Sequence, residues 1–495
     1  MDSVNCQEQL PDVKKNFIYR TLYEILTVIT PFITTPYVSR VLGADGIGIY
    51  SYTASIMAYF TLFAALGTMS YGEREIARHR DDPKKSSQLF WEIELMTVIT
   101  TSICIIVWAG VICFSVEYRW YFLALLPLLF GSMANISWYF MGYERVKYIV
   151  FRNCFCKILG VLLLFLLVRE KDDLVIYILM NSVITLAGNM SMWTYLPRML
   201  TKVDFKTLNI GRHFRETLVY FIPTIATSIY TVLDKTLIGV ITGNSYENGY
   251  YEQATKIINI VKSVVFTSVN AVMGSRISYL FSQKKYGEIH QRINHSMDFI
   301  MFLGYGAVFG MIGIANTFVP VFFGVGYAPV TILLYVMSPL VIIIGISNCL
   351  GSLYYNPAGL RAKSARVIIL GSVINLFFNI MMIPLAGGVG AAIASVIAES
   401  AISLIYIWMS DGYMTVKALW GYSWKRISAG TIMCITVICI GKIEISKTFV
   451  KLMVQILAGG SVYGVFLLCL HDSMIKELRR ISMQLLKRNT NRQEG

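Results

Sequence analysis

Charged and polar side chains recur at helical spacing inside three strongly apolar stretches of this sequence, residues 17–38, 217–241 and 248–273. An ionisable group within a membrane or a protein core is costly unless it faces protein or water. Residues three or four apart share one face of a helix, so each stretch gathers its polar groups on one side. We therefore predict a hydrated cavity lined by Arg20, Glu24, Lys235, Glu252, Lys256, Asn259 and Lys262.

Individual charged residues in these apolar stretches have alternative interpretations. Arg20 can also extend its guanidinium to the aqueous interface. Lys262 lies near the middle of its stretch, where such an extension is difficult, and its alternative is a buried ion pair. Lys157 stands near the start of an apolar stretch, and we predict that it extends to the interface. Glu92 and Glu94 begin a helix, where the helix dipole favours a carboxylate, so we predict a structural role for both.

A second group of polar residues could bind a monovalent cation. Asn375 and Asn379 are four residues apart and share a helix face. Asp234 supplies the nearest candidate carboxylate and Ser395 a hydroxyl. Carboxylate, amide and hydroxyl oxygens suit a hard cation such as Na⁺, but hydrogen bonding between packed helices explains the same residues. Glu399 is an alternative proton site.

The sequence offers little support for catalysis. The nine cysteines form no cluster with metal-ligand spacing. None of the five histidines accompanies a serine or cysteine in a nucleophile motif. We expect no cofactor, and no metal beyond a coupling ion. The loops predicted outside the membrane are too short to hold the acceptor of a polymerase or ligase.

The elements that position these residues are membrane-spanning helices. Of 495 residues, 56% are hydrophobic and 15% are charged, whereas soluble domains carry about 25% charged residues. Apolar blocks of about 20 residues, which cross a hydrocarbon core roughly 30 Å thick, fill the chain. They predict an all-α membrane protein with about 14 transmembrane helices, at residues 17–38, 47–69, 91–114, 120–141, 153–168, 174–195, 217–241, 248–273, 296–319, 328–350, 366–384, 386–410, 427–441 and 449–470.

The two halves of the chain resemble each other. Tyr50 and Arg74 recur as Tyr251 and Arg276 at nearly the same offset, which indicates a duplication. Parallel repeats place a substrate site at their interface and expose it by rocking one bundle against the other. The predicted domains are a six-helix bundle at 1–200, a second at 201–412, helices 13 and 14 at 413–471, and a basic cytoplasmic tail at 472–495.

The charge distribution indicates the orientation of the chain. Forty-three Lys and Arg residues outnumber 29 Asp and Glu residues and give a net charge of +14. Most of them fall in alternate loops on the side of the N-terminus, and the positive-inside rule then places both termini in the cytoplasm. The basic tail would rest near anionic membrane lipids. Nucleic acid is not needed to explain the charge.

Several motifs, in a fixed order along most of the chain, carry a family resemblance. They include Asn16, Pro31, Pro36 to Arg40, Gly43, Gly46, Gly48, Tyr50, Tyr71 to Arg74, Leu233 to Lys235, Gly249 to Tyr251, and Gly387 with Gly388. With them the chain resembles the oligosaccharide flippases, the polysaccharide-repeat exporters of the multidrug/oligosaccharidyl-lipid/polysaccharide superfamily. The resemblance implies two six-helix bundles related by a pseudo-twofold axis, with two helices appended, in the inner membrane of a bacterium.

The same resemblance implies a substrate, undecaprenyl-pyrophosphate carrying an oligosaccharide unit. The unit would move from the cytoplasmic to the outer leaflet for O-antigen, capsule or another envelope polysaccharide. Arg20, Lys256 and Lys262 would attract the pyrophosphate, because cationic side chains bind phosphate. A polysaccharide polymerase and a chain-length regulator are the implied partners.

The resemblance also bears on the coupling ion. The related lipid II flippases carry a sodium site at places similar to Asp234, Asn375 and Asn379. Asn379 stands where a second carboxylate is expected, so coupling to Na⁺ or to H⁺ both remain open. A multidrug exporter of the same superfamily is the alternative function, although the lysines of 248–273 disfavour cationic drugs. A membrane polymerase or ligase is the enzyme alternative.

Overall fold

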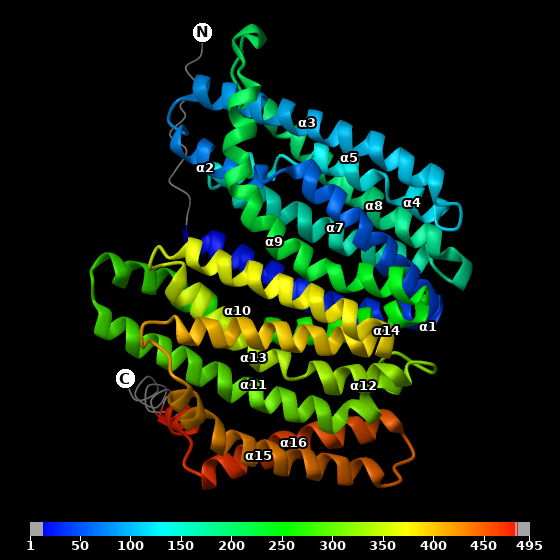
Figure 1. Ribbon diagram of the computed structural model, residues 1–495, viewed down its shortest axis with the longest axis vertical. Coiled ribbons are helices and arrows are strands. Elements are labelled where there is room, and N and C mark those ends of the chain that lie inside the picture. Colours follow the sequence, from blue (N-terminus) through cyan, green and yellow to red (C-terminus); the bar gives the residue numbers. More distant parts are fainter. Residues whose placement is uncertain (1–12, 481–482, 484–495) are drawn as a thin grey trace, which may run out of the picture. The chain divides into compact units, whose positions relative to one another are not determined.

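The computed structural model describes residues 13–480 and Met483. It does not describe the side chains of residues 13–21, 198, 222–224, 226–231, 267–268, 270–272 and 275. The described chain is helical and contains no strand (Figure 1). It forms two compact units, which divide between Thr236 and Leu237.

The first unit begins with α1 (Val13–Ala65), which contains two predicted spans. Its 53 residues would measure about 80 Å as one straight helix, far more than a hydrocarbon core of roughly 30 Å. The chain breaks at Gly43, whose φ of 69° lies in the left-handed region that favours glycine. α2 (Thr68–Arg78) and α3 (Pro83–Phe114) follow. The Asp82 side chain caps α3 by accepting from the backbone nitrogens of Lys84 and Lys85.

The predicted span 120–141 is broken into three short helices, α4 (Arg119–Leu125), α5 (Pro127–Met133) and α6 (Ser137–Gly142). α7 (Val146–Leu167), α8 (Leu174–Ser191) and α9 (Ile210–Thr242) complete the unit. Short 3₁₀ turns occupy Lys171–Asp173, Met192–Thr194, Leu196–Arg198 and Phe205–Thr207. α9 is one continuous helix, and the division between the units falls inside it.

An aromatic core joins α2, α3 and α6 at one end of the first unit. Trp138 stacks on Phe90 with ring centroids 5.6 Å apart, and both side chains are fully buried. Gly72 lies directly against this indole, because a Cβ built on it would come within 2.4 Å of the Trp138 ring. The absent side chain at Gly72 therefore sets how closely α2 approaches α6.

The second unit contains α10 (Ser245–Ser282), α11 (Tyr286–Phe322), α12 (Ala328–Met337) and α13 (Leu340–Leu350), which ends in a π turn at Gly351–Tyr355. α14 (Arg361–Trp408) is broken at Gly387, whose φ is 53°. The Glu247 carboxylate accepts from the Gly388 nitrogen at 2.8 Å. This bond satisfies a backbone donor that the break exposes.

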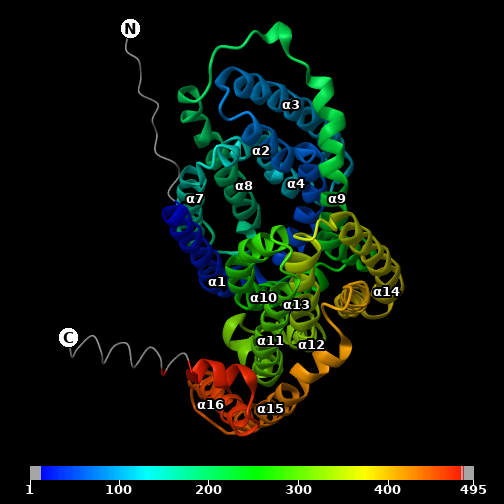
Figure 2. The same cartoon turned by 90° about the vertical axis from the view of Figure 1, so that its left-hand side faces the viewer.

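Two further helices, α15 (Val416–Lys442) and α16 (Thr448–Cys469), pack on α11 within the second unit (Figure 2). Arg426 of α15 is fully buried, and its guanidinium donates to both carboxylate oxygens of Asp472 at 3.0 and 3.1 Å. Arg426 also pairs with Asp298 of α11 at 2.6 Å. This ion cluster joins α11, α15 and the segment after α16.

Among the described residues, nine helices are long and apolar enough to cross a membrane, and a bent pair, α12 with α13 and its π turn, would make ten. Counting α1 and α14 as two spans each gives twelve, and the predicted spans 217–241 and 248–273 lie within α9 and α10, so the described helices are compatible with the predicted 14. The all-α membrane fold is confirmed, and the chain is a multi-pass membrane protein. The predicted domain boundaries at residues 200 and 412 stay predictions.

Candidate functional site

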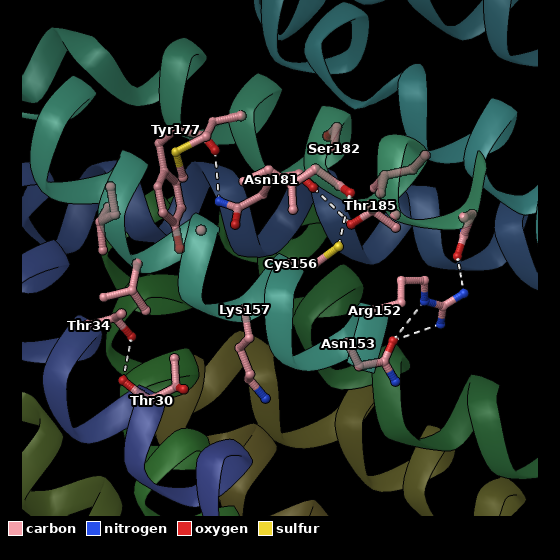
Figure 3. A pocket seen from close by; sticks show the side chains of 18 of the residues that line it. Thr30, Thr34, Arg152, Asn153, Cys156, Lys157, Tyr177, Asn181, Ser182 and Thr185 are labelled. Carbon is pink, nitrogen blue, oxygen red and sulfur yellow. Dashed lines mark hydrogen bonds between the residues drawn. The ribbon is translucent and has the colours of Figure 1, made fainter. Parts of the chain in front are cut away.

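A polar cavity of about 480 Å³ lies inside the first unit, mainly among α1, α7 and α8. Figure 3 shows its side chains from close by. Three helix faces supply them at helical spacing. The polar lining consists of Tyr23, Thr30, Thr34 and Tyr50 of α1, Arg152, Asn153, Cys156 and Lys157 of α7, and Tyr177, Asn181, Ser182, Thr185 and Asn189 of α8.

Arg152 is held in this cavity by neutral partners. Its Nε and Nη2 donate to Asn153 Oδ1 at 3.0 and 2.7 Å (Figure 3). Its Nη1 donates to Ser137 Oγ and to Asn189 Oδ1, both at 3.0 Å. These contacts fix the guanidinium in place without neutralising its charge.

Lys157 is the second cation of the cavity. Its Nζ donates to Thr27 Oγ1 of α1 at 2.9 Å and lies 5.4 Å from the centre of the Tyr23 ring. Lys157 therefore lines a cavity, a position not predicted from the sequence, and its extension to the aqueous interface stays a prediction. Within the part of the chain that the structure describes, neither Lys157 nor Arg152 forms an ion pair. Because an unpaired cation between membrane helices is costly, the cavity is electrostatically suited to an anion.

The α8 face supplies neutral hydrogen-bonding groups. Tyr177, Asn181, Thr185 and Asn189 recur at intervals of four residues and project from one side of the helix. Gly188 permits a close approach of α8 to α7, because a Cβ there would come within 2.6 Å of Cys156 Sγ. Hydroxyl and amide groups beside two cations can hold a ligand that combines an anionic group with a polyol.

The first unit also contains four of the residues predicted from spacing. Glu24 lies on α1 with an exposed side chain, and its charge acts on Lys157. Arg20 belongs to α1, but its side chain lies outside the described residues. Asp234 and Lys235 lie on α9, where the Asp234 side chain is buried and Lys235 is half-buried.

The remaining predicted cavity residues lie on α10 in the second unit. Lys256 pairs with Glu252 at 3.6 Å, one helical turn away. Asn259 is exposed. Lys262 is half-buried, and the charge of Glu399 on α14 acts on it. The structure thus supports a charged neighbour for Lys262, which was the alternative to a cavity role. The role of these four residues in a shared cavity stays a prediction.

The predicted ion site is divided between the units. Asn375 and Asn379 of α14 are fully buried, and Asn379 Nδ2 donates to Asn375 Oδ1 at 2.9 Å, so the two amides do share a face. Ser395 lies 3.5 Å from the hydroxyl of Tyr251. Since Asp234 belongs to the other unit, a site that combines all four residues stays a prediction, and so does Glu399 as a proton site.

A family profile described as polysaccharide biosynthesis protein matches residues 13–280, which is more than half of the chain. The chain belongs to this family. A relative in Escherichia coli (strain K12), named "Putative O-antigen transporter", is 23% identical over 405 residues, which cover 80% of this chain and 96% of the relative. The motifs quoted above had pointed to the same family, and that resemblance is confirmed.

Two further proteins resemble this chain. A "Probable low-salt glycan biosynthesis flippase" of Haloferax volcanii is 23% identical over 251 residues, which cover 50% of this chain and 51% of the relative. The solved structure of the lipid II flippase MurJ in an inward closed conformation matches with a TM-score of 0.68, 16% identity, 93% coverage of this chain and 100% of that chain. At this identity the match shows the fold alone.

Reasoning from the sequence missed the cavity of this family member, although a signal was present. The four-residue spacing of Tyr177, Asn181, Thr185 and Asn189 is as regular as the stripes that we did use. Arg152 directly precedes the predicted span 153–168 and Asn153 begins it, so neither was assigned to a cavity. The helix instead begins at Val146 and carries both side chains into the cavity.

Proposed function

We propose that this protein is a flippase for lipid-linked oligosaccharides and not an enzyme. The observation that carries the proposal is the cavity around Arg152 and Lys157, in which two cations without an ion-pair partner among the described residues lie beside a row of hydroxyl and amide groups. Membership of the polysaccharide biosynthesis family, the named functions of the relatives and the multi-pass fold support the same function.

The proposed substrate is undecaprenyl-pyrophosphate carrying an oligosaccharide repeat unit. Arg152 and Lys157 would bind the pyrophosphate, together with Arg20, Lys256 and Lys262 if these reach the same path. The α8 amides and hydroxyls would contact the sugars, and the lipid tail would stay in the bilayer. Alternating access would carry the head group from the cytoplasmic to the outer leaflet, coupled to Na⁺ or H⁺.

The proposal places the protein in the cytoplasmic membrane of a bacterium with both termini in the cytoplasm, where the basic loops and tail favour anionic lipids. A polysaccharide polymerase and a chain-length regulator would act on the delivered units. A multidrug exporter is disfavoured because the cavity presents cations, which repel cationic drugs.

Deletion of the protein in its native host tests the function. We expect surface polysaccharide to disappear while lipid-linked units accumulate on the cytoplasmic face, where an outside-added glycosidase cannot reach them. If those units instead reach the outer face and remain unpolymerised, the protein is a polymerase or ligase and the flippase proposal fails.

A further inference from the structure

Four side chains form a hydrogen-bonded chain at one end of the first unit, outside the cavity. Glu216 and His213 lie on α9, Tyr71 on α2 and Glu92 on α3. The Tyr71 hydroxyl donates to Glu216 Oε2 at 2.8 Å and lies 2.6 Å from His213 Nδ1. His213 Nε2 lies 2.6 Å from Glu92 Oε2. Three short contacts therefore connect four titratable groups.

The three contacts need more protons than the four side chains ordinarily carry. Each contact joins two electronegative atoms at hydrogen-bond distance and therefore needs a proton between them. Three contacts need three protons, wherever each one resides. A neutral histidine supplies one proton, a tyrosine supplies one, and two carboxylates supply none. The intact chain must therefore hold one proton more than these groups carry in their ordinary ionisation states at neutral pH.

The surroundings favour retention of this extra proton. His213, Tyr71 and Glu92 are almost completely buried, whereas the Glu216 side chain is 44% exposed. The buried Glu92 carboxylate and the partly exposed Glu216 carboxylate stand at opposite ends of these contacts, and a proton shared between them reduces their mutual repulsion.

The other charged groups near these four side chains come from the same helices. Glu75 on α2 and Arg212 on α9 act electrostatically on Tyr71, and Arg212 lies 3.4 Å from Glu216. Arg74 of α2 contacts Tyr220 of α9. On α3, Gln88 donates to Glu92 Oε1 at 2.8 Å, and the Asn209 nitrogen donates to the same oxygen at 2.9 Å.

We propose that Glu216, Tyr71, His213 and Glu92 form a proton-binding site whose extra proton ties α9 to α2 and α3. The proton enters from water at the exposed Glu216. Shifting one proton across each of the three contacts moves the surplus from the Glu216 carboxyl, through an imidazolium at His213, to the Glu92 carboxyl. When the surplus proton leaves, two acceptors face each other at one contact, and α9 loses that attachment.

If this site serves the proposed transport, the coupling ion is H⁺. That role rests on the proposed function, whereas the proton-binding site itself rests only on the contacts. The proton attaches α9 to α2 and α3. The division between the two units falls inside α9, so this helix contributes residues to both units.

Glu92→Gln separates proton binding from hydrogen bonding. A glutamine can donate its amide N–H to His213 Nε2 while its carbonyl accepts from Gln88 and Asn209. All three contacts then persist without an extra proton. Tyr71→Phe is the second variant. It leaves only the contact between His213 and Glu92, for which a neutral histidine supplies the proton.

The test is thermal unfolding of the purified full-length protein in detergent, from mildly acidic to mildly alkaline pH. A folded state that binds more protons than the unfolded state loses stability as pH rises. We expect the unfolding temperature of the wild type to fall as the pH rises. The fall should be smaller in E92Q and Y71F, because the folded state of each variant binds one proton fewer. The control is His295→Gln, because His295 faces Glu477 at 3.6 Å in an exposed pair. It should follow the wild type.

A wild-type slope in both E92Q and Y71F would overturn the proposed site. This measurement needs no substrate, so it stands apart from the flippase proposal. A parallel assay of pH-dependent transport tests the coupling role. If E92Q loses the pH dependence of stability but keeps the pH dependence of transport, H⁺ coupling at this site is excluded while proton binding stands.

Discussion

The ammonium of Lys157 donates to the hydroxyl of Thr27 at 2.9 Å and so joins α7 to α1 across the polar cavity. A neutral hydroxyl positions the cation but leaves its charge available. Arg152, five residues earlier on the same helix, is held in the same way by amide and hydroxyl oxygens. The two side chains therefore lie in fixed positions before a ligand arrives, which lowers the entropic cost of binding an anion.

Substitution of the two cavity cations tests the anion site. Lys157→Gln and Arg152→Gln should each weaken binding of the proposed substrate, a lipid-linked pyrophosphate, by about tenfold to a hundredfold, because a hydrogen bond to a charged group contributes about 1.5–3 kcal/mol. The matched control is Lys147→Gln, an exposed lysine of α7 outside the cavity. Complementation of surface polysaccharide at equal membrane levels is the readout. Equal activity in K157Q, R152Q and the control contradicts the assignment.

Substitution of Gly72 tests the close approach of α2 to the indole of Trp138. Gly72→Ala should destabilise the protein by about 1–3 kcal/mol, as overpacking does in other cores. Gly110→Ala on α3 is the control, because a Cβ at Gly110 meets no atom within 4 Å. That change should stabilise the helix by roughly 0.5–1 kcal/mol. Thermal unfolding of both variants in detergent measures the difference, and a stable G72A protein would show that α2 can move away.

The buried ion cluster of the second unit should be sensitive to loss of its cation. Arg426→Leu leaves Asp298 and Asp472 buried without their partner, and removal of one member of a buried pair costs about 3–5 kcal/mol. We expect proteolysis between α15 and α16 to become faster. Arg80→Gln removes an exposed pair with Glu144 and should change stability by less than about 1 kcal/mol. Equal protease resistance in both variants would mean that the apolar contacts of α11, α15 and α16 suffice.

Sodium binding can be tested without transport. If Asp234, Asn375 and Asn379 bind Na⁺, NaCl should raise the unfolding temperature of the wild type more than choline chloride does at equal ionic strength, because a ligand stabilises the state that binds it. Asp234→Asn should abolish the difference. The same sodium effect in that variant would locate the ion elsewhere, and no sodium effect in the wild type would favour H⁺.

Local patterns predicted the helices well and their interruptions poorly. The apolar block 91–114 falls inside α3, and the spacing of Asn375 and Asn379 predicted the face that their hydrogen bond confirms. The block 120–141 became three helices, and the break between α4 and α5 falls at Pro127, which lacks the backbone donor that a continuous helix needs. The length and hydropathy of that block carry no information about such a break.

The cavity was missed for a different reason. Thr27 and Lys157 are 130 residues apart in the chain, so no local spacing can pair them. A lysine near a helix end fits both an interfacial and a buried position, and only the neighbouring helix decides between them. The proton-binding chain likewise combines α2, α3 and α9, each of which contributes residues with an ordinary local role.

Under the proposed function, the face of α8 has a consequence for engineering new sugar selectivity. Asn181 Nδ2 donates to the Tyr177 carbonyl and Thr185 Oγ1 to the Asn181 carbonyl, so both side chains bond only to their own helix in the described structure. Asn189, by contrast, holds Arg152 and the Gly131 carbonyl. Positions 181 and 185 can therefore be randomised in a library while 189 is kept constant. Variants that export a foreign glycan could then be recovered by selection, with the backbone of the transporter left unaltered.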